Sequence, residues 1–220
     1  MIDILIPVLG RPQNAKPLVE SIHAATTVGH TCIFLATPGD TEQIEACKRT
    51  NAVTHLVAGD DFQYARKINA GAVFDYRNTP HEFMLLAADD LRFKPGWDVA
   101  AIRVWEETGK PVIGTNDLGN ATVMKGLHAT HSLVHRSYLE QGTIDEVGKL
   151  LHEGYHHNFC DTEFIDTAKH RDAFVFAADS HVEHLHPFWR KGPDDMIYRR
   201  GRKTFPRDRQ TYLKRRSLWR

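Results

Sequence analysis

Two adjacent carboxylates that follow an apolar run are the residues of this chain best placed to do chemistry. Asp89 and Asp90 follow residues 83–87 (FMLLA) after one alanine, and a Pro-Gly-Trp turn closes the segment at Trp97. Adjacent residues at a strand end point in different directions, so one carboxylate can bind a divalent cation while its neighbour contacts a hydroxyl group. Mg²⁺ needs few protein carboxylates when substrate phosphates complete its shell. The pattern indicates a metal and phosphate site, and the simpler alternative is a solvated surface turn.

A second pair of acids lies further along the chain, in residues 159–164 (FCDTEF). Asp161 and Glu163 are separated by one residue, and either carboxylate can take a proton from an attacking hydroxyl group. The alternative is that both acids only stabilise the first turn of a helix, where negative charge is favourable.

Histidines form the third group. His184 and His186 alternate along an extended segment, so both rings point to one face and can ligate a metal or contact a phosphate. A chain with 14 histidines can also place two in a loop by chance. The stretch His152–His156 (HEGYH) matches a zinc-protease pattern, but a glycine inside the required helix argues against that class.

The elements that position these groups alternate between strand and helix over the first ~90 residues. Apolar runs predict strands at 2–8, 31–36, 54–57, 83–87 and 111–115, and helical spacing predicts helices at 17–25, 41–49, 62–74 and 98–107. This alternation favours an α/β fold with a mostly parallel sheet covered by helices on both faces. Such sheets bind ligands beyond the carboxyl ends of their strands, so residues 10–12, 37–40 and 89–90 should converge on one crevice.

Several segments resemble the family 2 glycosyltransferases of the GT-A fold, over roughly residues 2–190. The acidic segment 85–97 resembles the family's metal motif, residues 2–12 (IDILIPVLGRP) its opening strand, and residues 64–71 (YARKINAG) the helix beside the nucleotide. The resemblance implies a single Rossmann-like GT-A domain over 1–189, with a nucleotide-sugar half (1–97) and an acceptor half (98–189). It also implies inverting transfer from a nucleotide-diphosphate sugar, UDP-sugar first, with Mn²⁺ or Mg²⁺ as cofactor, to an unidentified hydroxyl of a glycan, protein or modified DNA base.

The same resemblance implies roles for individual residues. Asp90 would ligate the metal with His184 or His186, and Asp161 would be the catalytic base with Glu163 in reserve. The residues expected to bind the donor are Pro7, Leu9, Arg11, Thr37, Asp40, Lys67, Asn69, Asp89, Arg199 and Arg202. The chain departs from the family where the second strand ends, because Thr37–Asp40 (TPGD) replaces the usual pair of acids that read the base.

Residues 190–220 form a basic C-terminal extension. They contain 12 Lys/Arg and 3 Asp, whereas the rest of the chain contains 16 Lys/Arg and 25 Asp/Glu. Arg199–Lys203 can act as a lid on the donor diphosphate, because guanidinium groups suit phosphate. Basic residues interleaved with aromatic ones can instead bind nucleic acid, which would make DNA the acceptor to test first. The simpler alternative is that the extension is solvated and only packs on the acidic remainder of the chain.

Composition, the lengths of the apolar runs and the cysteine count narrow the remaining classes of protein. Hydrophobic residues make up 41% and charged residues 25% of the 220 positions, as in an ordinary globular protein. No apolar run reaches the ~20 residues that span a bilayer, and the first residues do not resemble a signal peptide. Three widely spaced cysteines favour a reduced, cytoplasmic protein. A nucleotidyltransferase is the other enzyme class considered, but residues 10–12 (GRP) lack its glycine-rich loop.

Overall fold

The fold is built on β1 (Ile2–Pro7), a strand that is buried on both faces. β1 pairs in parallel with β2 (His30–Ala36) and with β4 (Phe83–Leu86), and β2 pairs in parallel with β3 (Val53–Leu56). Strands covered on both faces are nearly continuous apolar runs, which is how β1, β2 and β4 read in the sequence. The computed structural model describes residues 1–60, 62–79 and 81–219.

The second half of the sheet reverses direction at β7 (Ser132–His135). This strand is antiparallel both to β4 and to β6 (Val112–Asn116). β8 (Phe174–His184) is parallel to β6, and its last residues pair antiparallel with β5 (Leu91–Phe93). The strand order is β3-β2-β1-β4-β7-β6-β8-β5, so the sheet is mixed, and the expected parallel arrangement describes its first half.

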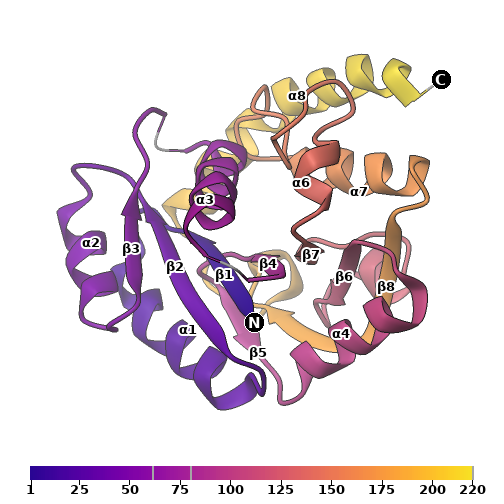
Figure 1. Cartoon of the computed structure of the whole chain (residues 1–220). Helices are drawn as coiled ribbons and strands as arrows, with labels where there is room; N and C mark the ends of the chain where they lie inside the picture. The colour runs from indigo at the N-terminus through magenta and orange to yellow at the C-terminus, as the bar shows by residue number, and fades with distance from the viewer. Residues whose placement is uncertain (61, 80, 220) are drawn as a thin grey trace.

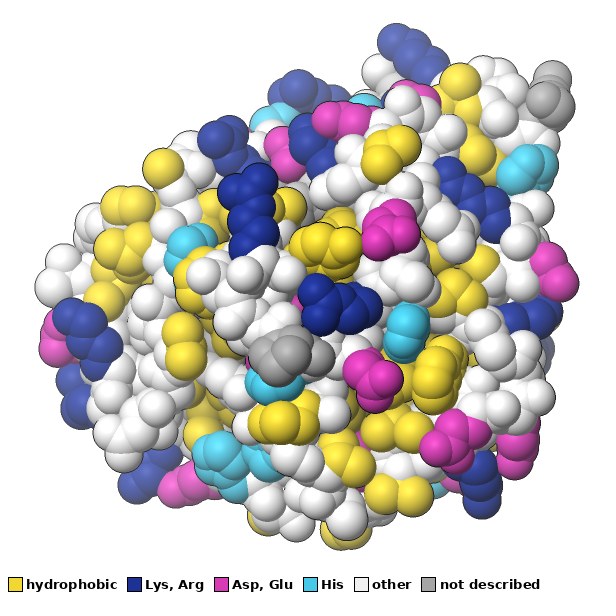
Figure 2. All heavy atoms as spheres, in the orientation of Figure 1, with side chains coloured by type: hydrophobic (Ala, Val, Ile, Leu, Met, Phe, Trp, Pro, Cys, Tyr) yellow, Lys and Arg dark blue, Asp and Glu magenta, His cyan; other side chains and the backbone are white. Residues whose placement is uncertain are grey.

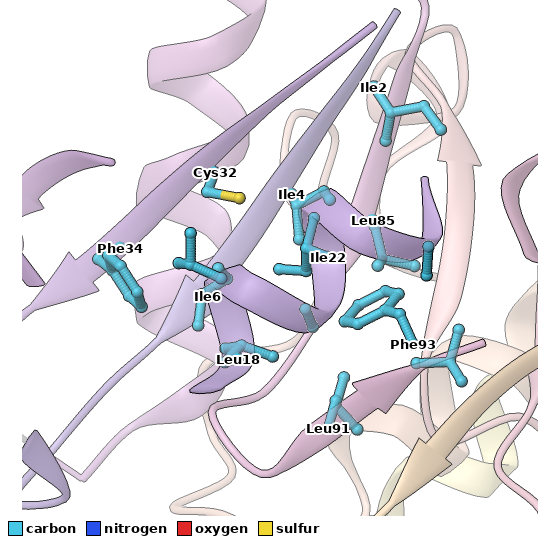
Figure 3. Packing of buried hydrophobic residues seen from close by; sticks show 14 of the residues in the cluster. Ile2, Ile4, Ile6, Leu18, Ile22, Cys32, Phe34, Leu85, Leu91 and Phe93 are labelled. Atoms are coloured by element: carbon cyan, nitrogen blue, oxygen red, sulfur yellow. The ribbon is translucent and has the colours of Figure 1, made fainter. Parts of the chain in front are cut away.

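Helices cover both faces of the sheet (Figure 1). α1 (Pro12–Ala25), α2 (Thr41–Lys48) and α4 (Trp97–Thr108) pack on one face, where Ile4 and Ile6 of β1 meet Leu18 and Ile22 of α1 (Figure 3). The other core contains residues of α3 (Tyr64–Asn78), α6 (Tyr138–Gln141) and α7 (Cys160–His170). The short elements are α5 (Ala121–Met124), η1 (Pro187–Trp189) and η2 (Arg216–Trp219).

The expected elements of the first half are present, and most of their ends agree within one or two residues. α1 differs, because it starts at Pro12 and not at Pro17. A proline at the first helical position loses only an N–H that has no partner within the helix. Because the helix starts at Pro12, the expected first residue, Pro17, lies inside it. The expected fold class, an α/β domain with helices on both faces of the sheet, is confirmed.

The C-terminal extension forms α8 (Met196–Arg215), which packs against the body of the protein (Figure 1). Asp208 of α8 is fully buried, and its carboxylate accepts the backbone N–H groups of residues 156–158 at 2.8–3.0 Å. Arg215 at the end of the helix hydrogen-bonds Glu163 and Asp145. The extension is thus tied to the body at several points.

Two further sequence expectations concern cysteines and membranes. Cys32, Cys47 and Cys160 are all buried and free. Within the described part of the chain, no helix combines the length and apolarity needed to cross a bilayer.

A buried pair of carboxylates joins β1 to α3 near the amino end of β1. Asp3 and Asp75 are both fully buried; the hydroxyl of Thr79 lies 2.9 Å from Asp3 Oδ2 and 2.5 Å from Asp75 Oδ1. His81 Nδ1 lies 2.6 Å from Asp3 Oδ2. Burial, together with the hydrogen bond to Asp3, raises the pKa of Asp75 to about 8. Asp75 is therefore protonated at neutral pH and can donate to its neighbour.

This pair predicts a loss of stability as the pH rises from about 4 to about 8. The pKa of Asp75 is raised from 3.8 to about 8 on folding, so its contribution to stability is fully present below about pH 4 and is lost progressively until the pH reaches about 8. We expect the melting temperature of the wild-type protein to fall between about pH 5 and pH 8. Asp75→Asn, which stays neutral, should fall much less. Calorimetry across this range tests the prediction, with the exposed Asp172→Asn as control; equal falls in wild type and Asp75→Asn would contradict it.

Candidate active site

A cleft of about 620 Å³ opens beyond the carboxyl ends of β1 and β4. This volume is typical of small-molecule sites. Nine of the residues expected from the sequence line it: Pro7, Leu9, Arg11, Lys67, Asp89, Asp90, Asp161, His184 and His186. These nine residues therefore share one cavity, although they lie up to 179 positions apart in the chain.

The loop after β1 is held from both sides. Gly10 has a φ of +58°, and its N–H donates to Asp40 Oδ2 at 2.8 Å. The Arg11 N–H donates to Gln43 Oε1 at 2.7 Å. From the other side, Lys67 Nζ donates to the carbonyl of Val8 at 2.7 Å. Asp40, expected to bind the donor, thus braces this loop and does not line the cleft.

The guanidinium of Arg11 lies among three carboxylates. Its Nη1 is 2.9 Å from Asp89 Oδ1 and 3.1 Å from Asp90 Oδ2. Its Nε and Nη2 make a two-point contact with Asp195 of the segment before α8, at 2.7 and 3.0 Å. The ring of Tyr198 covers the guanidinium at 4.5 Å, and the Tyr198 hydroxyl donates to Asp90. Arg11 therefore joins the acidic motif to the C-terminal helix.

The two adjacent acids have different electrostatic environments. Burial and the charge of Asp90 raise the pKa of Asp89 to about 7, although Arg11 opposes the shift. Burial alone would also raise the pKa of Asp90, but His184, Arg11 and Tyr198 together hold it well below its usual value. Asp90 is consequently the carboxylate that stays ionised and can attract a cation.

Three histidine rings lie in a row beside Asp90. His184 Nε2 is 3.4 Å from Asp90 Oδ1, and its ring centroid is 5.1 Å from those of both His131 and His186. His186 Nδ1 accepts the backbone N–H of Phe188 at 3.0 Å. His131 was not expected as a site residue, since nothing in its local sequence separates it from the chain's other histidines.

Asp161 lies in the first turn of α7, at another wall of the cleft. Its Oδ2 is 3.2 Å from His128 Nε2, and its Oδ1 accepts the N–H of Thr162 at 2.8 Å. Burial would raise the pKa of Asp161, but the contact with His128 and the backbone hydrogen bond lower it on balance. The carboxylate is ionised at neutral pH and can accept a proton. His128, also missed in the sequence, holds it in place.

Other expected site residues lie outside the cleft. Glu163 is buried, where it accepts a hydrogen bond from Tyr155 at 2.6 Å and pairs with Arg215. The amide of Asn69 holds the backbone of residues 150–151. Thr37 directly follows β2, and its buried hydroxyl has no hydrogen-bond partner among the described residues. The stretch 152–156 is a series of turns, and the helix of a zinc protease is absent there.

The cations expected to reach the donor diphosphate also lie elsewhere. Arg199 and Arg202 are exposed, and both pair with Asp194, Arg202 at 2.7 Å. The residues of α8 that do line the cleft are uncharged: Ile197, Tyr198, Phe205 and Tyr212. A helical period places these aromatic residues on the inner face, so neighbouring cations point outward.

The donor set at the acidic motif fits a divalent cation. Asp89 and Asp90 offer carboxylate oxygens and His184 an imidazole, and such ligands suit Mn²⁺ and Mg²⁺ when phosphates complete the shell. Arg11 is the positive charge that now lies between the two acids. A three-ligand group with atoms within 4.8 Å of one another occurs, within the described residues, only at Asp3, Asp75 and His81, away from the cleft.

The fold is that of the GT-A glycosyltransferases. Glucosyl-3-phosphoglycerate synthase from Mycobacterium tuberculosis, solved with Mn²⁺, UDP-glucose and phosphoglyceric acid, superposes with a TM-score of 0.61 at 11% identity and covers 84% of this chain and 72% of its own. S. aureus TarS superposes with a TM-score of 0.60 at 11% identity; 82% of this chain matches, but only 36% of TarS. No protein-family model and no curated protein sequence matches the chain.

The positions of Asp161 and Glu163 predict that mutation lowers stability strongly at Glu163 and only slightly at Asp161. Glu163→Gln breaks a buried charge pair with Arg215 and should cost about 3–5 kcal/mol of unfolding free energy. Asp161→Asn keeps the shape of the side chain, which is 29% exposed, and should change stability little. Chemical denaturation of both variants measures the difference. A Glu163→Gln protein as stable as wild type would refute the structural role of Glu163.

Proposed function

We propose that this protein is a metal-dependent inverting glycosyltransferase that moves a sugar from a nucleotide-diphosphate sugar to a hydroxyl acceptor. One observation carries the proposal: on a GT-A fold, a single cleft is lined by the Asp89–Asp90–His184 group and by the ionised Asp161. The complexes of the mycobacterial synthase with Mn²⁺ and UDP-glucose make a UDP-sugar and Mn²⁺ the first pair to test.

On this proposal the donor lies over the carboxyl ends of β1 and β4. The braced loop at Pro7 and Leu9 contacts the nucleoside, and Lys67 beneath it adds positive charge. Asp90 and His184 hold the metal, whose charge neutralises the donor diphosphate. Arg11 exchanges its two-point contact with Asp195 for the diphosphate, because a guanidinium binds phosphate oxygens in the same two-point manner as carboxylate.

Asp161 acts as the base on the acceptor side. The acceptor hydroxyl gives its proton to the Asp161 carboxylate while its oxygen attacks the anomeric carbon. The bond from that carbon to the diphosphate oxygen breaks, and the nucleoside diphosphate leaves. A single displacement with one carboxylate base inverts the anomeric configuration. His128 keeps the carboxylate ionised and oriented for the transfer.

The inner and outer faces of α8 offer different contacts to an acceptor. Phe205 and Tyr212 contact Phe159, with ring centroids at 5.1 and 5.3 Å, and form an aromatic wall in the cleft. The outward stripe of the helix is basic and exposed: Arg199, Lys203, Arg207 and Lys214. Lys and Arg side chains gather along this edge of the molecule (Figure 2). A polyanionic acceptor such as DNA therefore stays the candidate to test, with a log–log salt slope of about −0.9 per phosphate contacted.

The donor site predicts metal-dependent nucleotide binding. UDP at 100 times its dissociation constant should stabilise the protein by about 2.7 kcal/mol when Mn²⁺ is present. The effect should vanish in excess chelator and in Asp90→Asn, because the diphosphate charge is then not neutralised. Thermal shift and isothermal titration measure it, with Asp172→Asn as the exposed control. Equal stabilisation by UDP in chelator would remove Asp90 from the metal role.

The base predicts a separate loss of chemistry. Asp161→Asn should bind UDP with Mn²⁺ as wild type does, yet release UDP from a UDP-sugar panel about 10²–10⁴-fold more slowly, since general base catalysis is lost. Slow transfer to water makes the assay independent of the acceptor. Near-normal turnover in Asp161→Asn would reject the base assignment. Retained configuration in the product, read from the anomeric proton coupling, would reject the single displacement.

A further inference from the structure

The inner face of α8 carries aromatic side chains at a spacing of seven residues. Tyr198, Phe205 and Tyr212 all line the cleft. Seven residues make about two turns of an α-helix, so the three rings follow one another along one face at steps of about 10 Å. Phe205 is 46% exposed, and an exposed aromatic group at the wall of a cleft indicates a contact with a ligand.

The start of α7 adds a fourth ring to this aromatic wall. Phe159, the residue that precedes α7, has its ring centroid 5.1 Å from that of Phe205 and 5.3 Å from that of Tyr212. Phe159 also lines the cleft, two positions before Asp161, the proposed base. A flat, apolar surface therefore lies in the same part of the cleft as the carboxylate that would take the acceptor's proton.

Hydrogen-bond acceptors lie along the same stretch of α7, beside α8 (Figure 1). Asp161, Thr162 and Asp166 line the cleft, and the Tyr212 hydroxyl donates to Asp166. An ionised carboxylate accepts hydrogen bonds and donates none, so it suits a ligand that has several hydroxyl groups. This part of the cleft is thus aromatic on the side of α8 and rich in acceptor oxygens on the side of α7.

Positive charge is scarce in this part of the cleft. Among the described residues that line the cleft, Arg11 and Lys67 are the only arginine and lysine, and both lie on the donor side, at the acidic motif and beneath the loop after β1. His128 pairs with Asp161 at 3.2 Å. Even with His128 protonated, Asp161 and Asp166 together outweigh its charge. A phosphate or carboxylate group bound here would therefore be repelled.

Other cations of the C-terminal extension do not reverse this balance. Arg216 lies over the Tyr212 ring at 5.7 Å, but it does not line the cleft. Arg207 and Lys214 are exposed, and the helical period places them opposite Phe205 and Tyr212. These side chains can attract an anion to the surface, but they do not select the group that enters the cleft.

We propose that the acceptor group bound in the cleft is an uncharged saccharide whose apolar ring face packs on Phe205 and Tyr212. This deepens the proposed function and rests on it. The C–H groups on one face of a sugar ring pack against the negatively polarised face of an aromatic ring. The hydroxyl groups at the edge of the sugar donate to Asp161 and Asp166, and the hydroxyl that reaches Asp161 is the one that attacks. An anion such as phosphoglyceric acid, which the mycobacterial synthase binds, is opposed by the charges of this cleft.

The first test compares acceptors for the wild-type protein with UDP-sugars and Mn²⁺. The panel contains uncharged oligosaccharides of glucose, galactose, mannose and N-acetylglucosamine, their derivatives oxidised to uronic acids, phosphoglyceric acid, and DNA with hydroxymethylated bases. We expect transfer to at least one uncharged saccharide, with a kcat/KM at least about tenfold above that of its uronic acid, because like charges repel. Preferred transfer to an anion or to DNA, or no transfer to any uncharged saccharide, overturns the proposal.

The second test separates the inner and outer faces of α8. Phe205→Ala and Tyr212→Ala should each raise the KM of the saccharide about tenfold, because the sugar loses its stacking surface. Phe205→Tyr keeps the ring and should stay within about twofold of wild type, as should the exposed control Gln210→Ala. A loss of acceptor binding confined to Arg207→Ala and Lys214→Ala would assign the acceptor to the outer face and overturn the proposal.

Donor binding keeps this proposal separate from the proposed function. Phe205→Ala and Tyr212→Ala should bind UDP with Mn²⁺ as wild type does in isothermal titration, because the donor contacts lie at the acidic motif. A loss of UDP binding equal to the loss of acceptor binding overturns the acceptor role of these rings. Absence of Mn²⁺-dependent UDP binding in wild type overturns both proposals. If an alanine variant does not fold, the acceptor panel with the wild-type protein decides.

Discussion

The contact of Arg11 with Asp89, Asp90 and Asp195 is the interaction on which the site depends. Two adjacent acids, 7% and 11% exposed at their side chains, must have a cation beside them. Removing one partner from a buried pair leaves an uncompensated charge and typically costs about 3–5 kcal/mol. Arg11 supplies that charge here, and the same guanidinium holds the segment that leads into α8. The architecture of the cleft therefore follows from one electrostatic requirement at the end of β4.

In the structure, groups of the protein itself meet this requirement. The guanidinium and the Tyr198 hydroxyl contact the same carboxylate oxygen of Asp90, Oδ2, while His184 lies 3.4 Å from Oδ1. Asp195 likewise engages Arg11 as a phosphate would. On the proposed function, groups of the protein itself thus occupy contacts that a metal and a diphosphate would take.

Much of the fold was predictable from the sequence, because its signals are local. The apolar runs of β1, β2 and β4 and the helical spacing between them were enough for the first half of the sheet. The reversal at β7 could not be predicted, since four residues of strand carry no sign of their direction. Asp89, Asp90 and Asp161 were found by type and spacing. His131 was not, because its place in the cleft depends on its contact with a carbonyl 45 positions away in another strand.

The inner and outer faces of α8 explain why its charges were hard to interpret beforehand. All three aspartates of the extension are engaged: Asp194 with Arg202, Asp195 with Arg11, and Asp208 with three backbone N–H groups. The net charge of residues 190–220 thus says little about the cleft, which meets only uncharged residues of the helix.

The pairing of Arg11 with Asp195 also has an evolutionary consequence. The two residues are 184 positions apart, yet a change at either one removes the two-point contact that ties the first loop to the start of α8. Related sequences should therefore change these two positions together, and a shuffled chain that joins the first strand of one relative to the C-terminal helix of another should fail wherever the two parents differ there. We therefore expect the first loop and the start of the last helix to be inherited as one unit.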